Sequence, residues 1–154
     1  MKVVILCGGQ GTRIRDVSED VPKPMIPIGN RPILWHIMKS FAAFDYQDFV
    51  LCLGYKGSTI KDFFINYDML THDFQLTLGK PESLSLIDRA EKEAWHVTLA
   101  ETGLEAMTGD RVRKIKKYIG TDEHFILTYG DGVSDIDINA LVSFHKSHGK
   151  IATV

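Results

Sequence analysis

The N-terminal segment constrains the fold more than any other part of the chain. Residues 2–7 (KVVILC) form an uninterrupted apolar run, rich in β-branched side chains, that ends at Gly8 and Gly9. A continuous run without polar alternation is typical of a strand that is buried on both faces of a parallel sheet. Because parallel strands are joined by crossover connections that usually contain a helix, this run already favours an α/β fold.

Further strands are predicted at intervals along the chain. Residues 49–53 (FVLCL) and 125–128 (FILT) repeat the pattern of a buried strand. Residues 74–78 and 95–100 instead alternate apolar and polar side chains, as half-exposed strands at the edge of a sheet do. A polar stretch, residues 80–92, lies between these two segments.

Helices are predicted between these strands, with Asn30, Ser58 and Asp137 as the expected N-caps. Their predicted extents are residues 30–42, with Pro32 in the first turn, then 58–67, 108–119 and 137–149. The alternation of strands and helices predicts a doubly wound α/β fold with a mostly parallel sheet. At 154 residues, the chain is interpreted as one domain over residues 1–154.

Charge and cysteine content limit the classes of function. The chain has 18 basic and 20 acidic residues, so its net charge of -2 favours neither nucleic acid nor an anionic membrane as a partner. Cys7 and Cys52 lack metal-site spacing and are interpreted as buried, reduced thiols of a cytosolic protein. The N-terminal apolar run is too short for a signal peptide, and no stretch has transmembrane length, which favours a cytoplasmic location.

The last five residues, 150–154 (KIATV), have the pattern of the opening of one more buried strand. A domain that stops inside a core strand is unusual. We therefore expect the chain to be the N-terminal part of a longer protein, with its domain incomplete at the C-terminus.

The most informative motif is CGGQGTR, residues 7–13, directly after the first strand. Loops at the carboxyl edge of a parallel sheet bind ligands, and glycines at positions 8, 9 and 11 allow the backbone to approach a phosphate closely. Thr12 can add a hydroxyl group and Arg13 a charged, bidentate fork. The segment matches neither the Walker pattern nor the GxGxxG dinucleotide fingerprint, and a glycine-rich turn with a solvated arginine is the alternative.

Two further segments carry charged residues in restricted settings. Lys23 lies between prolines in PKPM, residues 22–25, which lowers the entropy lost when its ammonium group is directed at an anion. Asp131 follows the predicted strand 125–128 in YGDGVSD, where a carboxylate is well placed to hold Mg²⁺ against phosphates. The alternatives are an exposed proline-rich loop and an acidic turn, respectively.

Together, GGxGTR, PKPM and the following helix resemble the family of nucleotidyltransferases that activate sugar 1-phosphates, with a Rossmann-like fold. The resemblance implies that Arg13 and Lys23 are catalytic residues that contact the phosphates, and that Asp131 binds Mg²⁺ as the cofactor. It also implies a set of nucleotide-binding residues: Leu6, Cys7, Gly8, Gly9, Gly11, Thr12, Arg13, Lys23 and Gly130. Cys7 departs from the pattern, because relatives usually carry alanine there.

Five segments resemble one branch of this family, the cytidylyltransferases that act on glucose 1-phosphate: PILWHIM, GYKG, VTLAETG, MTGDR and TYGDGV. This branch implies CTP and glucose 1-phosphate as substrates, CDP-glucose and pyrophosphate as products, and a homo-oligomer. Thr108 and Arg111 become candidate contacts of CTP. Their alternative roles are a helix N-cap at Thr108 and a solvated basic face around Arg111.

Two other functions remain open. One is a thymidylyl-, uridylyl- or guanylyltransferase for a sugar 1-phosphate, and the other is a non-catalytic binding or regulatory module with the same fold. The family's second metal-binding aspartate and much of its sugar pocket would lie beyond Val154. We therefore expect this chain, as given, to bind CTP poorly, and inactivity is one outcome.

Overall fold

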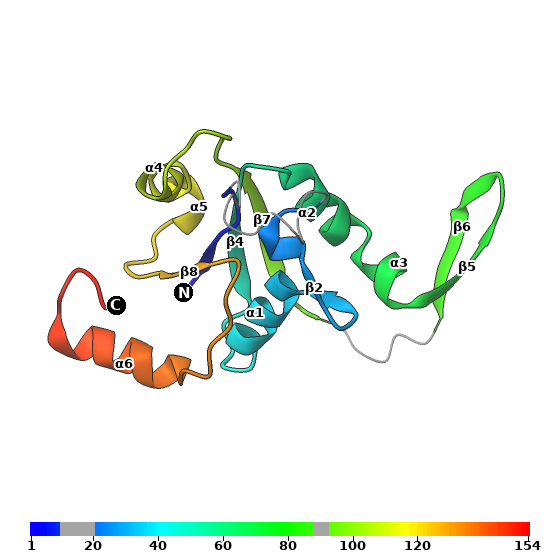
Figure 1. The fold of residues 1–154 in the computed structure, drawn as a ribbon. Coiled ribbons are helices and arrows are strands. Elements are labelled where there is room, and N and C mark those ends of the chain that lie inside the picture. The colour runs from blue at the N-terminus through cyan, green and yellow to red at the C-terminus, as the bar shows by residue number, and fades with distance from the viewer. Residues whose placement is uncertain (10–20, 88–92) are drawn as a thin grey trace.

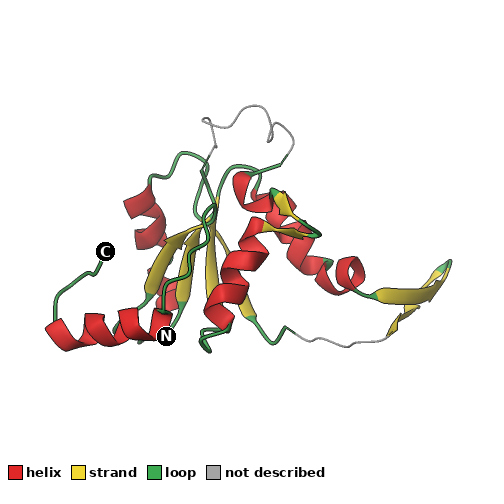
Figure 2. Cartoon of the chain, turned by 60° about the horizontal axis from the view of Figure 1, so that its bottom comes forward, coloured by secondary structure: helices red, strands yellow, loops and turns green. Residues whose placement is uncertain are grey.

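The computed structural model describes residues 1–9, 21–87 and 93–154. A four-stranded parallel sheet forms the centre of the molecule, with helices on both of its faces (Figures 1 and 2). A β-hairpin projects away from this body, as Figure 1 shows at the right. The predicted α/β class is confirmed.

The sheet consists of β1 (Val3–Leu6), β4 (Asp48–Leu53), β7 (His96–Glu101) and β8 (Ile126–Tyr129). Its strand order is β7-β4-β1-β8, and every neighbouring pair is parallel. Val3 is in register with Phe49 on one side and with Ile126 on the other. All four residues of β1 are buried, as its unbroken apolar run predicts.

The two faces of the sheet belong to two separate apolar clusters. Val3 and Ile5 of β1 pack in a cluster with side chains of α1 (Ile33–Ala42), α2 (Gly57–Ile65) and α6 (Ile138–His148). Val4 and Leu6 point to the other face and belong to a cluster with Ile115 and Ile119. Ile115 lies between α4 (Thr108–Lys114) and α5 (Lys116–Ile119), and Ile119 is the last residue of α5. Helices thus cover both faces, so the prediction of a doubly wound sheet is also confirmed.

Two predicted helix starts are wrong by a few residues. Asn30 lies in the two-residue turn of a small hairpin, β2 (Pro27–Ile28) and β3 (Arg31–Pro32), in which Gly29 has a φ of 63°. The N-cap of α1 is Pro32, which makes no side-chain capping bond. Ser58 lies inside the first turn of α2, because Lys56 takes the left-handed conformation at the N-cap.

The predicted ends of the helices differ in a similar way. The helix predicted up to Tyr67 stops at Ile65, and Tyr67 begins a separate short helix, α3 (Tyr67–Thr71). The helix predicted over 108–119 is divided at the buried Ile115. The last helix agrees with its prediction: the Asp137 carboxylate accepts a bond from the Ala140 N–H at 2.9 Å, and Gly149 ends α6 with a φ of 62°.

The projecting hairpin was not predicted. β5 (Asp73–Thr77) pairs with β6 (Lys80–Ile87) in an antiparallel ribbon, and Gly79 in the turn has a φ of 80°. Residues 74–78 therefore do not lie at the edge of the main sheet, as their alternation predicts, and β6 lies in the stretch 80–92, for which the sequence predicts no strand. Alternation specifies a half-exposed strand but not its partner, which explains why residues 74–78 were assigned to the wrong sheet. The prediction that 95–100 lies at a sheet edge is confirmed by β7.

The C-terminal residues 150–154 do not form the strand that their composition predicts. They have no regular secondary structure, and Ile151 and Val154 are fully exposed. The contacts of this segment are polar: the Thr153 hydroxyl lies 2.9 Å from His145 Nδ1 and 2.8 Å from His148 Nε2. Among the described residues, no helix is both long and apolar enough to cross a membrane.

Candidate functional site

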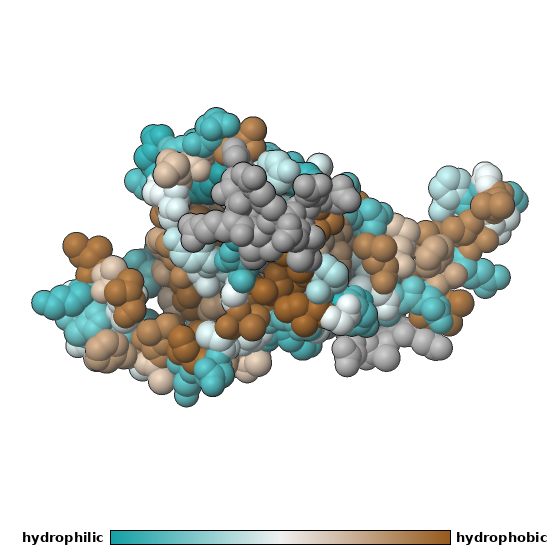
Figure 3. Space-filling view, in the orientation of Figure 1, coloured by the Kyte–Doolittle hydropathy of each residue, from teal (hydrophilic) through white to brown (hydrophobic). Residues whose placement is uncertain are grey.

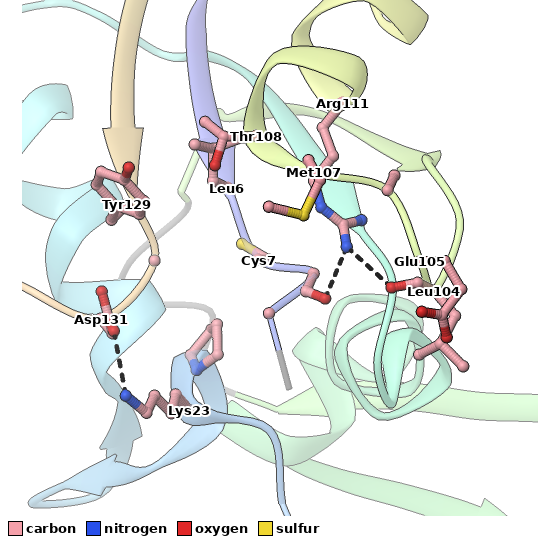
Figure 4. Close-up of a pocket in the computed structure, with 15 residues that line it drawn as sticks. Leu6, Cys7, Lys23, Leu104, Glu105, Met107, Thr108, Arg111, Tyr129 and Asp131 are labelled. Carbon is pink, nitrogen blue, oxygen red and sulfur yellow. Dashed lines mark hydrogen bonds and ion pairs between the residues drawn. The ribbon is translucent and has the colours of Figure 1, made fainter. Parts of the chain in front are cut away.

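The strand order fixes where a ligand can bind. The chain runs from β1 outward to β4 and β7, and then crosses to place β8 on the opposite side of β1. The segments that follow β1 and β8 therefore diverge at the carboxyl edge of the sheet, and such a switch point leaves a crevice for ligands in open α/β sheets. A cavity of about 730 Å³ lies there, and Figure 4 shows the residues that line it.

Every predicted site residue that the structure describes lines this cavity. They come from the loop after β1, from the turn that carries Lys23, from the start of α4 and from the end of β8: Leu6, Cys7, Gly8, Gly9, Lys23, Thr108, Arg111, Gly130 and Asp131. Gly11, Thr12 and Arg13 lie outside the described residues. The residues cited for separate reasons in the sequence thus converge on one place, while their individual roles stay predictions.

Lys23 and Asp131 lie next to each other on one side of the cavity, with their charged groups directed at each other (Figure 4). The Lys23 Nζ lies 3.7 Å from the Asp131 Oδ2. Lys23 begins η1 (Lys23–Met25), a short 3-10 turn in which the Met25 N–H donates to the Pro22 carbonyl at 2.7 Å and the Pro24 ring is buried. The prolines therefore hold the backbone of Lys23, as the sequence suggested, while the ammonium group extends into the cavity.

Gly130 connects the turn of Lys23 to the strand ends. Its N–H donates to the Leu6 carbonyl at 3.1 Å. A Cβ at this position would lie 3.0 Å from both the Cys7 Sγ and the Pro24 Cγ. The glycine therefore allows β1, β8 and η1 to approach closely, which places Asp131 and Lys23 on the same side of the cavity.

Asp131 has the chemistry of a Mg²⁺ ligand. Its side chain is 47% exposed and faces the cavity, so its carboxylate oxygens are accessible to a cation. Mg²⁺ is commonly held by one or two carboxylates together with substrate phosphates and water. Within the ranges 1–9, 21–87 and 93–154, no group of three or more His, Cys, Asp or Glu side chains is arranged to hold a metal. Asp131 thus fits the part of one carboxylate ligand in a site that substrate phosphates would help to complete.

Arg111 is not part of a solvated basic face, because only 5% of it is exposed. Its Nη1 donates to the Leu53 carbonyl at 3.0 Å, to the Thr102 hydroxyl at 2.6 Å and to the Gly103 carbonyl at 2.8 Å. Its Nη2 donates to the Gly8 carbonyl at 2.9 Å and to the Leu104 carbonyl at 3.3 Å. The motif identifies Arg111, but no sequence pattern indicates these acceptors.

Thr108 does not act as the cap of α4. The N-cap is Met107, which makes no side-chain bond, and Thr108 is the first residue of the helix and lines the cavity. The loop just before it was missed by the sequence analysis: Leu104, Glu105, Ala106 and Met107 also line the cavity, as do Tyr129 and Pro24. Because loops after parallel strands meet at one edge, the position of this loop after β7 could have revealed it.

The two cysteines are free and buried on opposite faces of the sheet. Burial raises the pKa of the Cys7 thiol far above its ordinary value, and burial raises that of Cys52 to about 11. Both are therefore protonated and unreactive near neutral pH, as the interpretation of reduced, buried thiols requires.

Comparison with known proteins agrees with this geometry. The family described as Nucleotidyl transferase matches residues 2–154. The chain belongs to the nucleotidyl transferase family. Among its nucleotidyl transferase relatives, glucose-1-phosphate cytidylyltransferase of Salmonella typhimurium is 47% identical over 154 residues, which cover 100% of this chain and 59% of the relative. A probable glucose-1-phosphate cytidylyltransferase of Bacillus subtilis is 45% identical with the same coverage. The chain thus spans about 59% of the length of these relatives.

Solved structures of nucleotidyl transferase folds resemble the chain over most of its length. HddC from Yersinia pseudotuberculosis, crystallised in complex with GMP-PN, has a TM-score of 0.66 and 27% identity over 94% of this chain and 53% of that one. A UDP-glucose pyrophosphorylase complexed with UDP-glucose has a TM-score of 0.65 over 96% of this chain and 53% of that one. At 15% identity, this second likeness concerns the fold alone.

Proposed function

We propose that this chain is the nucleotide-binding part of an enzyme that transfers a cytidylyl group from CTP to glucose 1-phosphate, giving CDP-glucose and pyrophosphate. The observation that carries the proposal is the convergence of Lys23 and Asp131 in one cavity at the switch point of the sheet. The choice of CTP and glucose 1-phosphate is supported by the relatives at 45–47% identity.

The reaction needs charge stabilisation more than a protein nucleophile. A sugar phosphate carries about -1.5 to -2 charge. One of its oxygens attacks the α-phosphorus of an already anionic nucleotide, and the bond from that phosphorus to the β-phosphate oxygen breaks. The electron pair leaves with pyrophosphate. Catalysis of such transfers rests on positioning and on cations placed where negative charge develops.

Lys23 is proposed to supply one of these cations at the reacting phosphates. Its ammonium group extends from a turn held by buried Pro24, so little reorganisation is needed when an anion arrives. Asp131 is proposed to bind Mg²⁺, which would neutralise phosphate charge when bound. A cation held by the Asp131 carboxylate would leave the Lys23 ammonium to contact the substrate.

The segments that line the cavity besides Lys23 and Asp131 are proposed to bind the nucleotide. Gly8 and Gly9 continue β1 into the cavity. A Cβ on Gly9 would meet no atom of the described residues within 4 Å, which favours the approach of a phosphate to its backbone. Thr108 and Arg111 of α4 also line the cavity. Arg13, with Gly11 and Thr12, is proposed to complete the phosphate contacts, as the family resemblance implies.

The test is a measurement of pyrophosphate release by the full-length gene product that contains this chain, with glucose 1-phosphate, Mg²⁺ and each nucleoside triphosphate in turn. We expect the highest kcat/KM with CTP. Equal or higher values with UTP, dTTP or GTP would reject the cytidylyl assignment in favour of the alternative transferases. Tight binding of a nucleotide or nucleotide sugar without any pyrophosphate release would instead identify a non-catalytic module.

A further inference from the structure

Arg111 is a buried cation whose hydrogen-bond acceptors, within the described part of the chain, are neutral oxygens. A charge away from water is costly unless hydrogen bonds replace its hydration. The four N–H groups on Nη1 and Nη2 face the five acceptors described above, at 2.6 to 3.3 Å. A nucleotide that contacted Nη1 or Nη2 directly would therefore have to compete with acceptors that the protein already provides.

These acceptors come from the carboxyl ends of three neighbouring strands. Gly8 follows β1, Leu53 is the last residue of β4, and Thr102 and Gly103 follow β7. Two of the segments joined in this way, the loop after β1 and the loop before α4, are walls of the cavity. Figure 4 shows the Arg111 guanidinium between the segment that follows Cys7 and the segment of Leu104. Its Nη2 donates to the Gly8 and Leu104 carbonyls, which belong to these two segments.

Two glycines make room for the guanidinium. A Cβ on Gly8 would overlap the terminal atoms of Arg111, and a Cβ on Gly54 would lie 2.7 Å from its Nη1. Gly54 does not line the cavity, whereas Gly8 does. The absence of a side chain at position 8 thus serves the packing of Arg111, in addition to any approach of a phosphate.

We propose that Arg111 is a positioning residue, which holds the loop after β1 and the loop before α4 at the separation that a nucleotide requires. The proposal rests on the proposed function for the identity of the ligand. It differs from a direct contact with CTP, because the effect of Arg111 is transmitted through the carbonyl groups of both walls.

The first test compares Arg111→Lys with Arg111→Met by isothermal titration of Mg²⁺–CTP into the full-length gene product. A lysine keeps the charge but not the planar fork that reaches acceptors on several sides. If Arg111 positions the walls, both variants lose affinity by a similar factor, on the order of 10-fold to 100-fold. If it acts as a charge on the nucleotide, Arg111→Lys keeps most of the affinity, and the proposal is overturned.

The second test measures, without a nucleotide, whether the loop after β1 stays in place. Cys7 is 1% exposed and precedes Gly8 directly, whereas Cys52 is buried on the other face of the sheet. Mass spectrometry after labelling with a thiol reagent under native conditions measures each cysteine separately. We expect Arg111→Lys and Gly54→Ala to accelerate labelling of Cys7 and to leave Cys52 protected. The control is Gly109→Ala on α4, because a Cβ at this position would meet no atom within 4 Å in the part of the chain that the structure describes.

The outcomes separate this proposal from the proposed function. If another nucleoside triphosphate binds better than CTP, the affinity comparison is made with that nucleotide. If none binds, the proposed function fails, and the labelling experiment still decides whether Arg111 holds the loop after β1. Equal acceleration at Cys7 and Cys52 would indicate general loss of stability and would overturn the positioning role.

Discussion

The ion pair between Lys23 and Asp131 contributes little to the stability of the fold. Their side chains are 19% and 47% exposed, and their charged atoms are 3.7 Å apart. Pairs of this kind contribute about 0 to 1 kcal/mol, because water screens them and holding two side chains costs entropy. The ion pair therefore matters for the site more than for stability, because it places opposite charges inside the cavity.

At the residue scale, the activity of the full-length gene product should depend on Lys23 far more than its stability does. We expect Lys23→Ala to lower kcat by a factor on the order of 10² to 10³, because a preorganised cation is lost. The unfolding free energy should fall by less than about 1 kcal/mol. The control is Lys61→Ala, which removes an ion pair with Glu101 outside the cavity. Wild-type kcat in Lys23→Ala would contradict the role of Lys23.

Single residues were predictable where a motif and its place after a strand agreed. Gly8, Gly9 and Asp131 follow strands that the sequence identified, so their meeting at one sheet edge could be expected. The bonds of Arg111 could not, because four of its five acceptors are backbone carbonyls, among them those of Gly8 and Leu53. Every residue has a carbonyl group, so no residue type in the sequence marks such an acceptor.

At the scale of an element, helix α6 tests the one N-cap that both sequence and structure assign. The Asp137 carboxylate accepts the Ala140 N–H at 2.9 Å. We expect Asp137→Ala to lower the unfolding free energy by about 0.5 to 2 kcal/mol, measured by urea denaturation. Asp135→Ala is the matched control, since Asp135 is an exposed acid two residues before the cap. A loss of equal size in the control would show that charge, and not capping, is responsible.

Helix α4 should carry a small dependence of stability on pH. The Lys114 and Arg113 side chains donate to the Asp110 carboxylate, and these bonds lower the pKa of Asp110 below its ordinary value of 3.8. A lowered pKa in the folded state means that the contribution is present above pH 3.8 and is lost as the pH falls through the folded-state pKa.

The measurement compares urea midpoints of the wild type and Asp110→Asn from about pH 5 to about pH 3. We expect the wild type to be more stable at the upper end and the difference to disappear toward the lower end. A difference that stayed constant over this range would contradict the role of ionised Asp110.

Elements differed in how well their boundaries could be predicted. β1 and β4 are buried on both faces, so their apolar runs define them directly. The start of α1 was misplaced because Asn30, a common capping residue, is used in the turn between β2 and β3. A residue type that suits both caps and turns cannot distinguish them without the strand pairing around it.

At the scale of the whole molecule, the order of the strands in the sheet is what the sequence analysis lacked for predicting the cavity. The sequence predicted three buried strands, and β1 and β4 are buried. The prediction is wrong for β8, which is half exposed because it forms the edge of the sheet beside β1, on the side away from β4. That arrangement produces the switch point, and the switch point explains why residues from the two ends of the sequence share one cavity. The cavity is thus a property of topology, to which the motifs add chemistry.

The projecting hairpin of β5 and β6 should be separable from this arrangement. All residues of β5 are exposed, and no residue of the hairpin lines the cavity (Figures 1 and 3). We therefore expect replacement of residues 73–87 by a short glycine–serine segment to leave the fold and nucleotide binding nearly unchanged, with affinity within about 2-fold. Circular dichroism and titration with Mg²⁺–CTP measure these two properties.

Size-exclusion chromatography of the same variant distinguishes two consequences of removing the hairpin. Leu76 and Leu78 are 43% and 90% exposed, so the ribbon carries apolar surface that a second copy could cover. A variant that stays folded, binds nucleotide and elutes as a smaller species would assign the hairpin to association between copies. A variant that loses the circular dichroism of the sheet would contradict the prediction, because the central strands would then depend on a ribbon that does not pair with them.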